Sequence, residues 1–179
     1  MVDAVKIIEK YYPVQSEAYR ILVGHSRSVA DKALQIGQAH PELSLDLQFV
    51  EEAAMLHDIG AFLCYAPEID CHGNADYICH GYLGAELLRN EGYPRHAFVC
   101  ERHTGTGLTL EMIVHHKLPI PHRDMRPQSI EEQLICFADK FYSKTALDTE
   151  KSVEKVFQNM TKYGMESVLR FDGWCKLFL

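Results

Sequence analysis

Residues 53–62 read AAMLHDIGAF, an apolar run that leads directly into an adjacent histidine and aspartate. On a helix, Asp58 lies four positions after Ala54, and His57 follows the same apolar face at a spacing of three or four residues. Gly60 then ends the helix. Ionisable side chains on a buried face are costly unless they have partners. The stretch therefore predicts a helix that carries His57 and Asp58 into the interior, toward partners elsewhere in the chain.

The composition is that of a soluble globular domain, with 47% hydrophobic and 24% charged residues in a chain of 179. This length predicts a single domain over residues 1–179 with a sizeable core. No apolar run approaches the roughly 20 residues that a membrane span needs. The first residues, MVDAVKIIEKYY, lack the apolar region of a signal peptide. We therefore expect a cytoplasmic protein with no membrane partner.

Charge and cysteine content exclude some functions. The formal net charge is −7, and no basic stripe is present, so we expect no nucleic-acid partner. A small phosphorylated substrate stays possible if a bound metal supplies positive charge. The six cysteines form no C-x-x-C pair, so we expect reduced, packed thiols rather than a zinc knuckle. The ten histidines are about twice what general residue usage gives.

Apolar residues recur at spacings of three and four along the chain, without convincing two-residue alternation. This pattern predicts an all-α bundle of about seven to nine helices. A capping signature, Ser129 followed by Glu132, marks one helix start. The expected helices cover residues 3–11, 16–39, 46–59, 74–91, 94–103, 109–116, 129–145, 150–163 and 165–170. The Pro-rich loop at residues 117–128 either borders the substrate or is a plain surface connection.

Helical phase turns a set of histidines and aspartates inward. The set comes from five helical segments and consists of His25, His57, Asp58, His80, His103 and Asp139. Four imidazoles and two carboxylates are ligands for one or two divalent transition-metal ions, namely Fe, Mn, Co, Ni or Zn, with Mg also open. For two ions, Asp58 is the natural bridging carboxylate. The alternative for any single histidine is a core residue bonded to a carbonyl.

The order of these residues resembles the HD-domain metal-dependent phosphohydrolase superfamily. The matching stretches are His25, HDIG at 57–60, His80 in HGYLGAELL, His103 in ERHTGTGLT and Asp139 in FADK. The resemblance covers about residues 20–145, with the helices of 150–179 expected to pack on this part. The two middle histidines are similar to those of the two-metal members, and the chain looks most like the small uncharacterised HDIG proteins. The extended GYP motif of cyclic-dinucleotide phosphodiesterases is missing.

This resemblance implies an HD-type helical bundle and a ligand set. The first metal would be held by His25, His57, Asp58 and Asp139. The second would be held by His80 and His103, with Asp58 bridging and orienting a water that loses its proton near neutral pH and attacks phosphorus. The implied activity is that of a phosphomonoesterase or phosphodiesterase on a small phosphate ester, nucleotide or dinucleotide. Two alternatives remain: an HD-type diiron oxygenase of a small organic substrate, and a non-catalytic metal-dependent nucleotide sensor.

One position departs from the family pattern. Several relatives place Lys or Arg just after the HDIG segment, where it helps to bind phosphate, but this chain has Ala61. Phosphate contacts are then expected from other basic residues near the motifs. The candidates are Lys140, Arg102, Arg27 and Lys144, each of which is otherwise an ordinary solvated charge.

Overall fold

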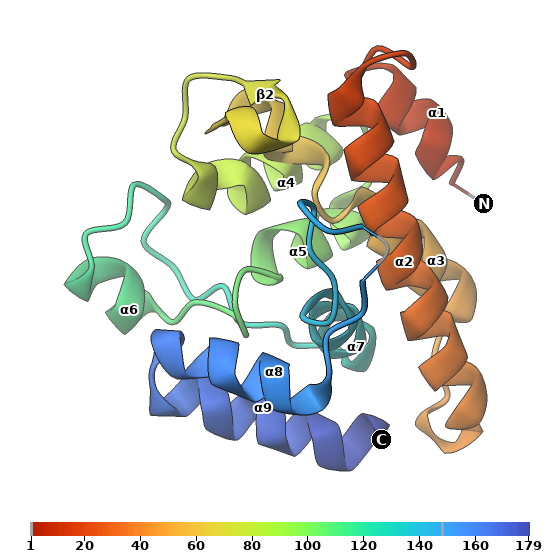
Figure 1. The fold of residues 1–179 in the computed structure, drawn as a ribbon, viewed down its shortest axis with the longest axis vertical. Coiled ribbons are helices and arrows are strands. Elements are labelled where there is room, and N and C mark those ends of the chain that lie inside the picture. The colour runs from red at the N-terminus through yellow and green to blue at the C-terminus, as the bar shows by residue number, and fades with distance from the viewer. Residues whose placement is uncertain (1, 148) are drawn as a thin grey trace.

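The computed structural model describes residues 2–147 and 149–179 of the chain. Within these ranges the fold is the all-α bundle that the sequence predicts, with one small two-stranded sheet that it does not predict (Figure 1). The helices are α1 (Ala4–Glu9), α2 (Glu17–Ala39), α3 (Leu47–Leu56), α4 (His80–Asn90), α5 (Pro94–Arg102), α6 (Leu110–His115), α7 (Ile130–Asp139), α8 (Val153–Met160) and α9 (Met165–Phe178). The strands β1 (Tyr65–Ala66) and β2 (Cys71–His72) pair antiparallel.

Side-chain caps explain where most of these helices begin. In each capped case a side-chain oxygen accepts the backbone N–H three residues later, which satisfies one of the free donors of the first turn. The capping residues are Asp3, Ser16, Asp46, Thr109, Ser129 and Ser152. The start predicted at Ser129 is therefore confirmed, with its Oγ 3.1 Å from the amide nitrogen of Glu132.

The helix that carries the His-Asp pair ends earlier than the periodicity predicts. It stops at Leu56, and residues 59–63 form a 3-10 turn. The buried Tyr12 accounts for this turn, because its hydroxyl donates to the carbonyl of Ile59 and accepts the amide of Phe62, at 2.9 and 3.0 Å. A side chain from outside the helix thus satisfies backbone groups that a longer helix would pair internally.

The predicted helix of residues 74–91 begins only at His80. The backbone of Ala75 pairs with the chain before β1, donating to the carbonyl of Leu63 and accepting the amide of Tyr65. The segment 61–73, which lies between two predicted helices, contains the small hairpin of β1 and β2 and a 3-10 turn at Pro67–Ile69. Because the amide and carbonyl of Ala75 are used in this way, the helix cannot extend back to residue 74.

The end of the chain differs from prediction in two places. Helix α7 ends at Asp139 rather than near residue 145, because Lys151 binds the carbonyls of Lys140, Phe141 and Tyr142 through its Nζ and backbone N–H. Helix α9 continues to Phe178 rather than residue 170. Its aromatic face packs on Phe137 of α7, with ring centroids 5.3 Å from Phe171 and 5.4 Å from Phe178.

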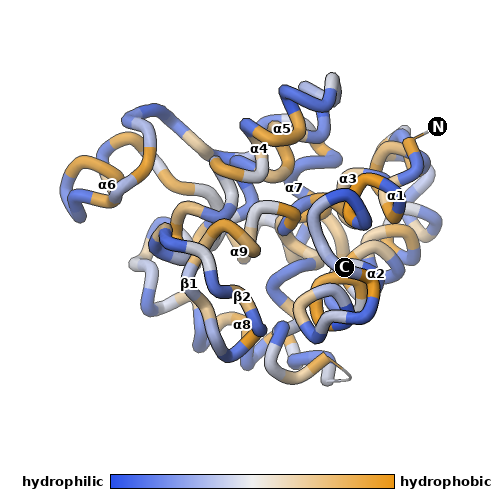
Figure 2. The backbone as a smooth tube through the Cα atoms, turned by 90° about the horizontal axis from the view of Figure 1, so that it is seen from above, coloured by the Kyte–Doolittle hydropathy of each residue, from blue (hydrophilic) through white to orange (hydrophobic). Residues whose placement is uncertain are grey.

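The main core lies where α2, α3, α5, α7 and α9 meet. Helix α3 is predominantly apolar, as the hydropathy view shows (Figure 2). Both views place α6 at the edge of the molecule, away from α2 and α3. All six cysteines are free, and all but Cys175 are buried, as expected for packed thiols. No helix in the described ranges is long and apolar enough to cross a membrane.

Candidate metal centre

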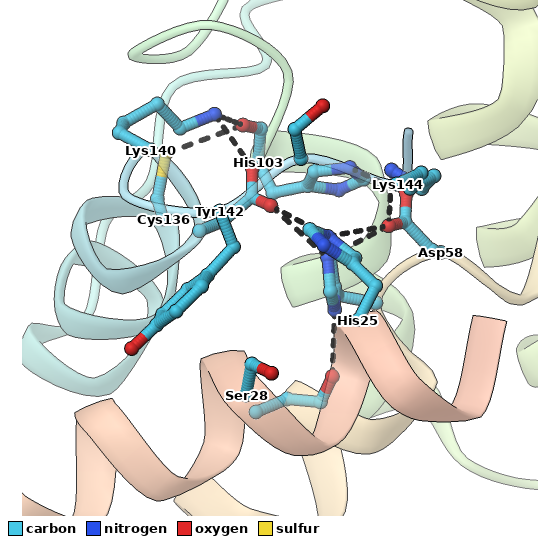
Figure 3. A network of polar contacts seen from close by, with 12 residues as sticks. His25, Ser28, Asp58, His103, Cys136, Lys140, Tyr142 and Lys144 are labelled. Carbon is cyan, nitrogen blue, oxygen red and sulfur yellow. Dashed lines mark hydrogen bonds and ion pairs between the residues drawn. The ribbon is translucent and has the colours of Figure 1, made fainter. Parts of the chain in front are cut away.

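Asp58 lies at the centre of a buried group of imidazoles and a second carboxylate. His57 caps the end of α3, and both residues of the pair have no exposed area. One carboxylate oxygen, Oδ2, lies 2.9 Å from Nε2 of His57 and 3.3 Å from Nε2 of His25 in α2 (Figure 3). Asp139, the last residue of α7, places Oδ1 3.0 Å from Nε2 of His25 and 3.5 Å from that of His57. These four residues form a first cluster whose donor atoms all lie within 4.8 Å of one another.

The other carboxylate oxygen of Asp58 faces a second cluster. Its Oδ1 lies 3.3 Å from Nε2 of His80 and 3.3 Å from Nε2 of His103. His80 is the first residue of α4, and His103 caps the end of α5. All six residues predicted to face inward are therefore brought together, and the two oxygens of Asp58 are directed to different clusters.

Three of the histidines are held in one orientation by backbone carbonyls. Each ring places Nδ1 near the carbonyl three residues earlier: His57 at 2.6 Å from Ala54, His80 at 2.6 Å from Tyr77 and His103 at 2.7 Å from Cys100. A carbonyl only accepts, so Nδ1 carries a proton, and Nε2 is the nitrogen that faces Asp58 and can bind a cation through its lone pair once it is deprotonated. This arrangement is typical of metal-binding histidines. The sequence gives no signal for it, because the acceptors are main-chain groups.

Several polar atoms of the centre are buried and have no hydrogen-bond partner of suitable geometry in the described chain. Among the described residues, Nε2 of His57 and both carboxylate oxygens of Asp58 are sealed from solvent without a partner of suitable geometry. Such groups are rare in proteins unless a water or an ion satisfies them. Imidazole nitrogens together with carboxylate oxygens suit divalent transition metals. The residues therefore fit one metal ion in each cluster.

The electrostatics of the centre favour a cation. Burial opposes ionisation of Asp58, but His57 and Lys144 hold the pKa of its carboxyl well below the usual range. Burial lowers the pKa of His103 to about 4, despite the pull of Asp58. Burial also disfavours protonated His57, but the charges of Asp58 and Asp139 raise its pKa to about 9. The carboxylates thus remain anionic, and a cation in the centre is stabilised by them.

Two glycines allow the turn after Asp58 to approach α4. A Cβ on Gly60 would collide with the carbonyl oxygen of His80 and the backbone nitrogen of Gly84. A Cβ on Gly84 would in turn meet the Sγ of Cys100 and the nitrogen of Gly60. Close backbone contact between the two segments brings His80 to Asp58.

Basic side chains reach the centre from the segment after α7. Nζ of Lys144 lies 2.6 Å from Oδ2 of Asp58, and Nζ of Lys140 lies 2.8 Å from Oδ2 of Asp139 (Figure 3). Lys140 also donates to the carbonyl of His103 at 3.1 Å. Ala61 is fully buried in a small apolar cluster. Positive charge beside the centre therefore comes from the segment after α7 and not from residue 61.

The two arginine candidates lie elsewhere. Arg102 pairs with Glu132 at 3.0 Å and lies over the ring of Phe98. Arg27 pairs with Glu51 at 2.8 Å on the outer side of α2. Neither arginine lines the cavity next to the centre. Both arginines are therefore engaged in ion pairs outside this cavity, and helical phase does not reveal which carboxylates lie nearby. Their contact with a substrate stays a prediction.

A cavity of about 500 Å³ opens beside His25 and Asp139. Its polar lining includes Lys140, Lys144, Lys151, Lys162, Tyr77 and Tyr142. The Pro-rich loop at 117–128 does not contribute to this lining. Instead, Ile120 and Met125 are buried in a separate apolar cluster, and Met125 pairs with Leu108. Of the two expectations for this loop, the structure favours a surface connection.

Comparison with known proteins gives one family match and several relatives. The HD domain family model matches residues 22–143. An uncharacterized protein of Methanocaldococcus jannaschii is 30% identical over 152 residues, which cover 83% of this chain and 82% of that protein.

Two further relatives are described as tRNA (cytidine(56)-2'-O)-methyltransferases. The protein of Thermoplasma volcanium is 31% identical over 146 residues, and that of Picrophilus torridus is 28% identical over 160 residues. The matches cover 81% and 84% of this chain but only 38% and 42% of those proteins. The chain thus spans about two fifths of the length of these two relatives.

Among solved structures, the chain is similar to the HD domain of the L. monocytogenes phosphodiesterase PgpH. The TM-score is 0.58, with 97% of this chain and 86% of that chain covered. Sequence identity is 20%, so this likeness concerns the fold.

Proposed function

Because the chain belongs to the HD-domain family, we propose that it is a metal-dependent phosphohydrolase acting on a small phosphorylated substrate such as a nucleotide or dinucleotide. The observation that carries this proposal is the position of Asp58. Its two oxygens are buried and have no hydrogen-bond partner of suitable geometry among the described residues, and they face two separate groups of imidazole nitrogens. A bridging carboxylate between two such groups is the arrangement that a two-metal hydrolytic site requires.

The protein side chains have distinct roles in this proposal. A pair of divalent ions in the two clusters would lower the pKa of a bound water and neutralise charge on the phosphoryl oxygens. Asp58 would contribute one carboxylate oxygen to each cluster and so fix the position of the two clusters relative to each other. Lys144 presents an ammonium group beside Asp58, where it can donate to a phosphoryl oxygen of the substrate. Tyr77 stacks on His80 at a centroid distance of 4.5 Å, so this imidazole has little freedom to rotate.

Methyl transfer is not part of the proposal. The relatives named as tRNA methyltransferases match this chain over less than half of their own length. The buried site here consists of histidines and carboxylates that converge on one another, which is a metal-binding arrangement.

The test is an anaerobic activity screen with Mn²⁺, Fe²⁺, Co²⁺ and Zn²⁺. Substrates would be p-nitrophenyl phosphate, bis-p-nitrophenyl phosphate, nucleoside mono-, di- and triphosphates and dinucleotides. We expect at least one metal to support release of phosphate or of a phosphorylated product, and Asp58→Asn to abolish it. Asp172→Asn, at a partly exposed aspartate of α9, is the control and should keep full activity.

Two other outcomes would contradict hydrolysis. No phosphate release in this screen, together with oxygen consumption when the metal-loaded protein is given an organic substrate in air, would favour the oxygenase alternative. Metal-dependent nucleotide binding without turnover of any substrate would favour a sensor.

A further inference from the structure

The cavity beside the metal centre is richer in positive charge than attack at one phosphate requires. Four lysines line it: Lys140, Lys144, Lys151 and Lys162. Among the described residues that line it, Asp139 and Glu68 are the only carboxylates. The chain as a whole carries a net charge of −7, so this concentration of lysines runs against the general balance. The lining therefore suits an anion that extends beyond the metal centre.

Two of these four lysines form no ion pair with the carboxylates of the metal centre. Lys140 and Lys144 contact its carboxylates, Asp139 and Asp58. By contrast, neither Lys151 nor Lys162 forms an ion pair with a carboxylate of the described chain. Their charges are free to meet a ligand.

Lys151 is held in place with one donor to spare. Its Nζ donates to the carbonyls of Tyr142 and Lys140 at 2.6 and 3.3 Å. An ammonium group has three protons, so one remains for an acceptor in the cavity. Burial lowers the pKa of Lys151; the charge of Asp139 opposes this shift, and the charges of Lys140 and Lys144 add to it. A half-buried ammonium in this position is stabilised by an incoming anion.

Lys162 reaches the cavity from the C-terminal part of the chain. It lies in the 3-10 turn Thr161–Tyr163 between α8 and α9 and is exposed. Asn159 and Tyr163 from the same segment also line the cavity. These residues and Lys151 lie outside residues 22–143, the part that the family model matches. This side of the cavity is therefore a feature of this chain beyond the family core.

We propose that the cavity binds a substrate with at least two linked phosphate groups, one at the metal centre beside Lys144 and the next against Lys151 and Lys162. This inference rests on the proposed phosphohydrolase function and names its substrate class. A nucleoside diphosphate or triphosphate has the required chemistry, and a cavity of about 500 Å³ is of a size typical for such small ligands. The ring of Tyr163, which is partly exposed at the cavity wall, offers a face for the organic part of the substrate.

The test compares two non-hydrolysable probes on the Mn²⁺-loaded protein by titration calorimetry, with the same free Mn²⁺ in every solution. Methylphosphonate carries one phosphonate group, and methylenebisphosphonate carries two. We expect Lys162→Gln and Lys151→Gln each to weaken bisphosphonate binding about 5- to 10-fold, as for loss of one charge-assisted contact. Methylphosphonate binding should change less than about twofold, because its single group lies at the metal centre.

The matched control is Lys155→Gln. Lys155 is exposed on α8, seven residues before Lys162, and does not line the cavity. The Lys155→Gln substitution removes the same charge and should change the binding of neither probe. Equal weakening of both probes by Lys162→Gln, or no effect on the bisphosphonate, would overturn the inference.

Two features keep the result decisive. Lys151 binds main-chain carbonyls, so its variant is checked for folding by circular dichroism; Lys162 is exposed, and its variant carries the test alone if Lys151→Gln unfolds. Binding is measured without turnover. Lysine-dependent bisphosphonate binding without hydrolysis of any substrate would refute the proposed function and keep this inference. Hydrolysis without lysine-dependent bisphosphonate binding would keep the proposed function and refute this inference.

Discussion

His80 and His103 direct their Nε2 atoms at each other across 3.0 Å, while the Nδ1 atom of each ring is bound to a backbone carbonyl. Two lone pairs at this distance repel each other in a buried site. A cation between them, or close to both, turns this repulsion into coordination. Since Oδ1 of Asp58 lies 3.3 Å from both nitrogens, the three atoms form one side of a ligand set.

Gly60→Ala is expected to destabilise the protein by about 3 kcal/mol, because the new methyl group would collide with the backbone of α4. Chemical denaturation of the metal-free protein measures this loss. The control is Gly173→Ala in α9, where a Cβ meets nothing within 4 Å. That change should be neutral or stabilise by up to about 1 kcal/mol, since alanine favours the helix. Similar effects for the two substitutions would show that the close approach at Gly60 is not needed.

Tyr12→Phe is expected to cost about 1–3 kcal/mol, because it leaves the carbonyl of Ile59 and the amide of Phe62 without their partner in a buried site. Thermal and urea unfolding measure this cost. Tyr65→Phe, at a tyrosine that is 64% exposed, should change stability by less than about 0.5 kcal/mol. A Tyr12 variant as stable as the wild type would contradict the role of its hydroxyl in ending α3.

The helical framework and the inward-facing residues follow from the sequence. Periodicity places His25 and the His57–Asp58 pair on buried faces, and Ser129 is a recognisable cap. These features depend on local spacing, which a sequence shows directly.

Features that depend on distant contacts do not follow from the sequence. The early ends of α3 and α7 depend on Tyr12 and Lys151, which bind the backbone from outside each helix. The contact of Lys144 with Asp58 and the pairing of Arg102 with Glu132 likewise depend on tertiary structure. Spacing alone names basic residues near a motif but does not show which of them point into the cavity.

Lys144→Gln is expected to lower kcat/KM for the best substrate by about 10- to 100-fold, as for loss of a charged contact to a phosphoryl group. Steady-state kinetics on the metal-loaded protein measures this effect. Lys155→Gln on α8 removes an equal charge away from the centre and should stay within about twofold of the wild type. Unchanged kinetics of the Lys144 variant would show that its ammonium group does not contact the substrate.

His96 gives a prediction for the pH dependence of stability. Burial lowers its pKa below 6.5, and the hydrogen bond to Glu52 offsets this only in part. As the pH falls below about 6.5, the unfolded chain binds the proton first. The stability that neutral His96 contributes above this pH is therefore lost as the pH falls through its folded-state pKa.

His96→Gln cannot take up this proton. Urea unfolding at intervals from pH 7.5 to 5 should show the stability of the variant rising relative to that of the wild type as the pH falls. A constant difference between the two proteins across this range would contradict the lowered pKa of His96.

The measurement that tests the account most directly is the metal content of Asp58 and His103 variants. Purified proteins would be loaded with Mn²⁺ or Fe²⁺, freed of excess metal and analysed by inductively coupled plasma mass spectrometry, with circular dichroism to confirm folding. We predict about two metal ions per wild-type chain, about one in His103→Ala, and close to none in Asp58→Ala, because both clusters use its carboxylate. Full metal occupancy in the folded Asp58→Ala protein would contradict the bridging role of Asp58 and with it the two-metal centre.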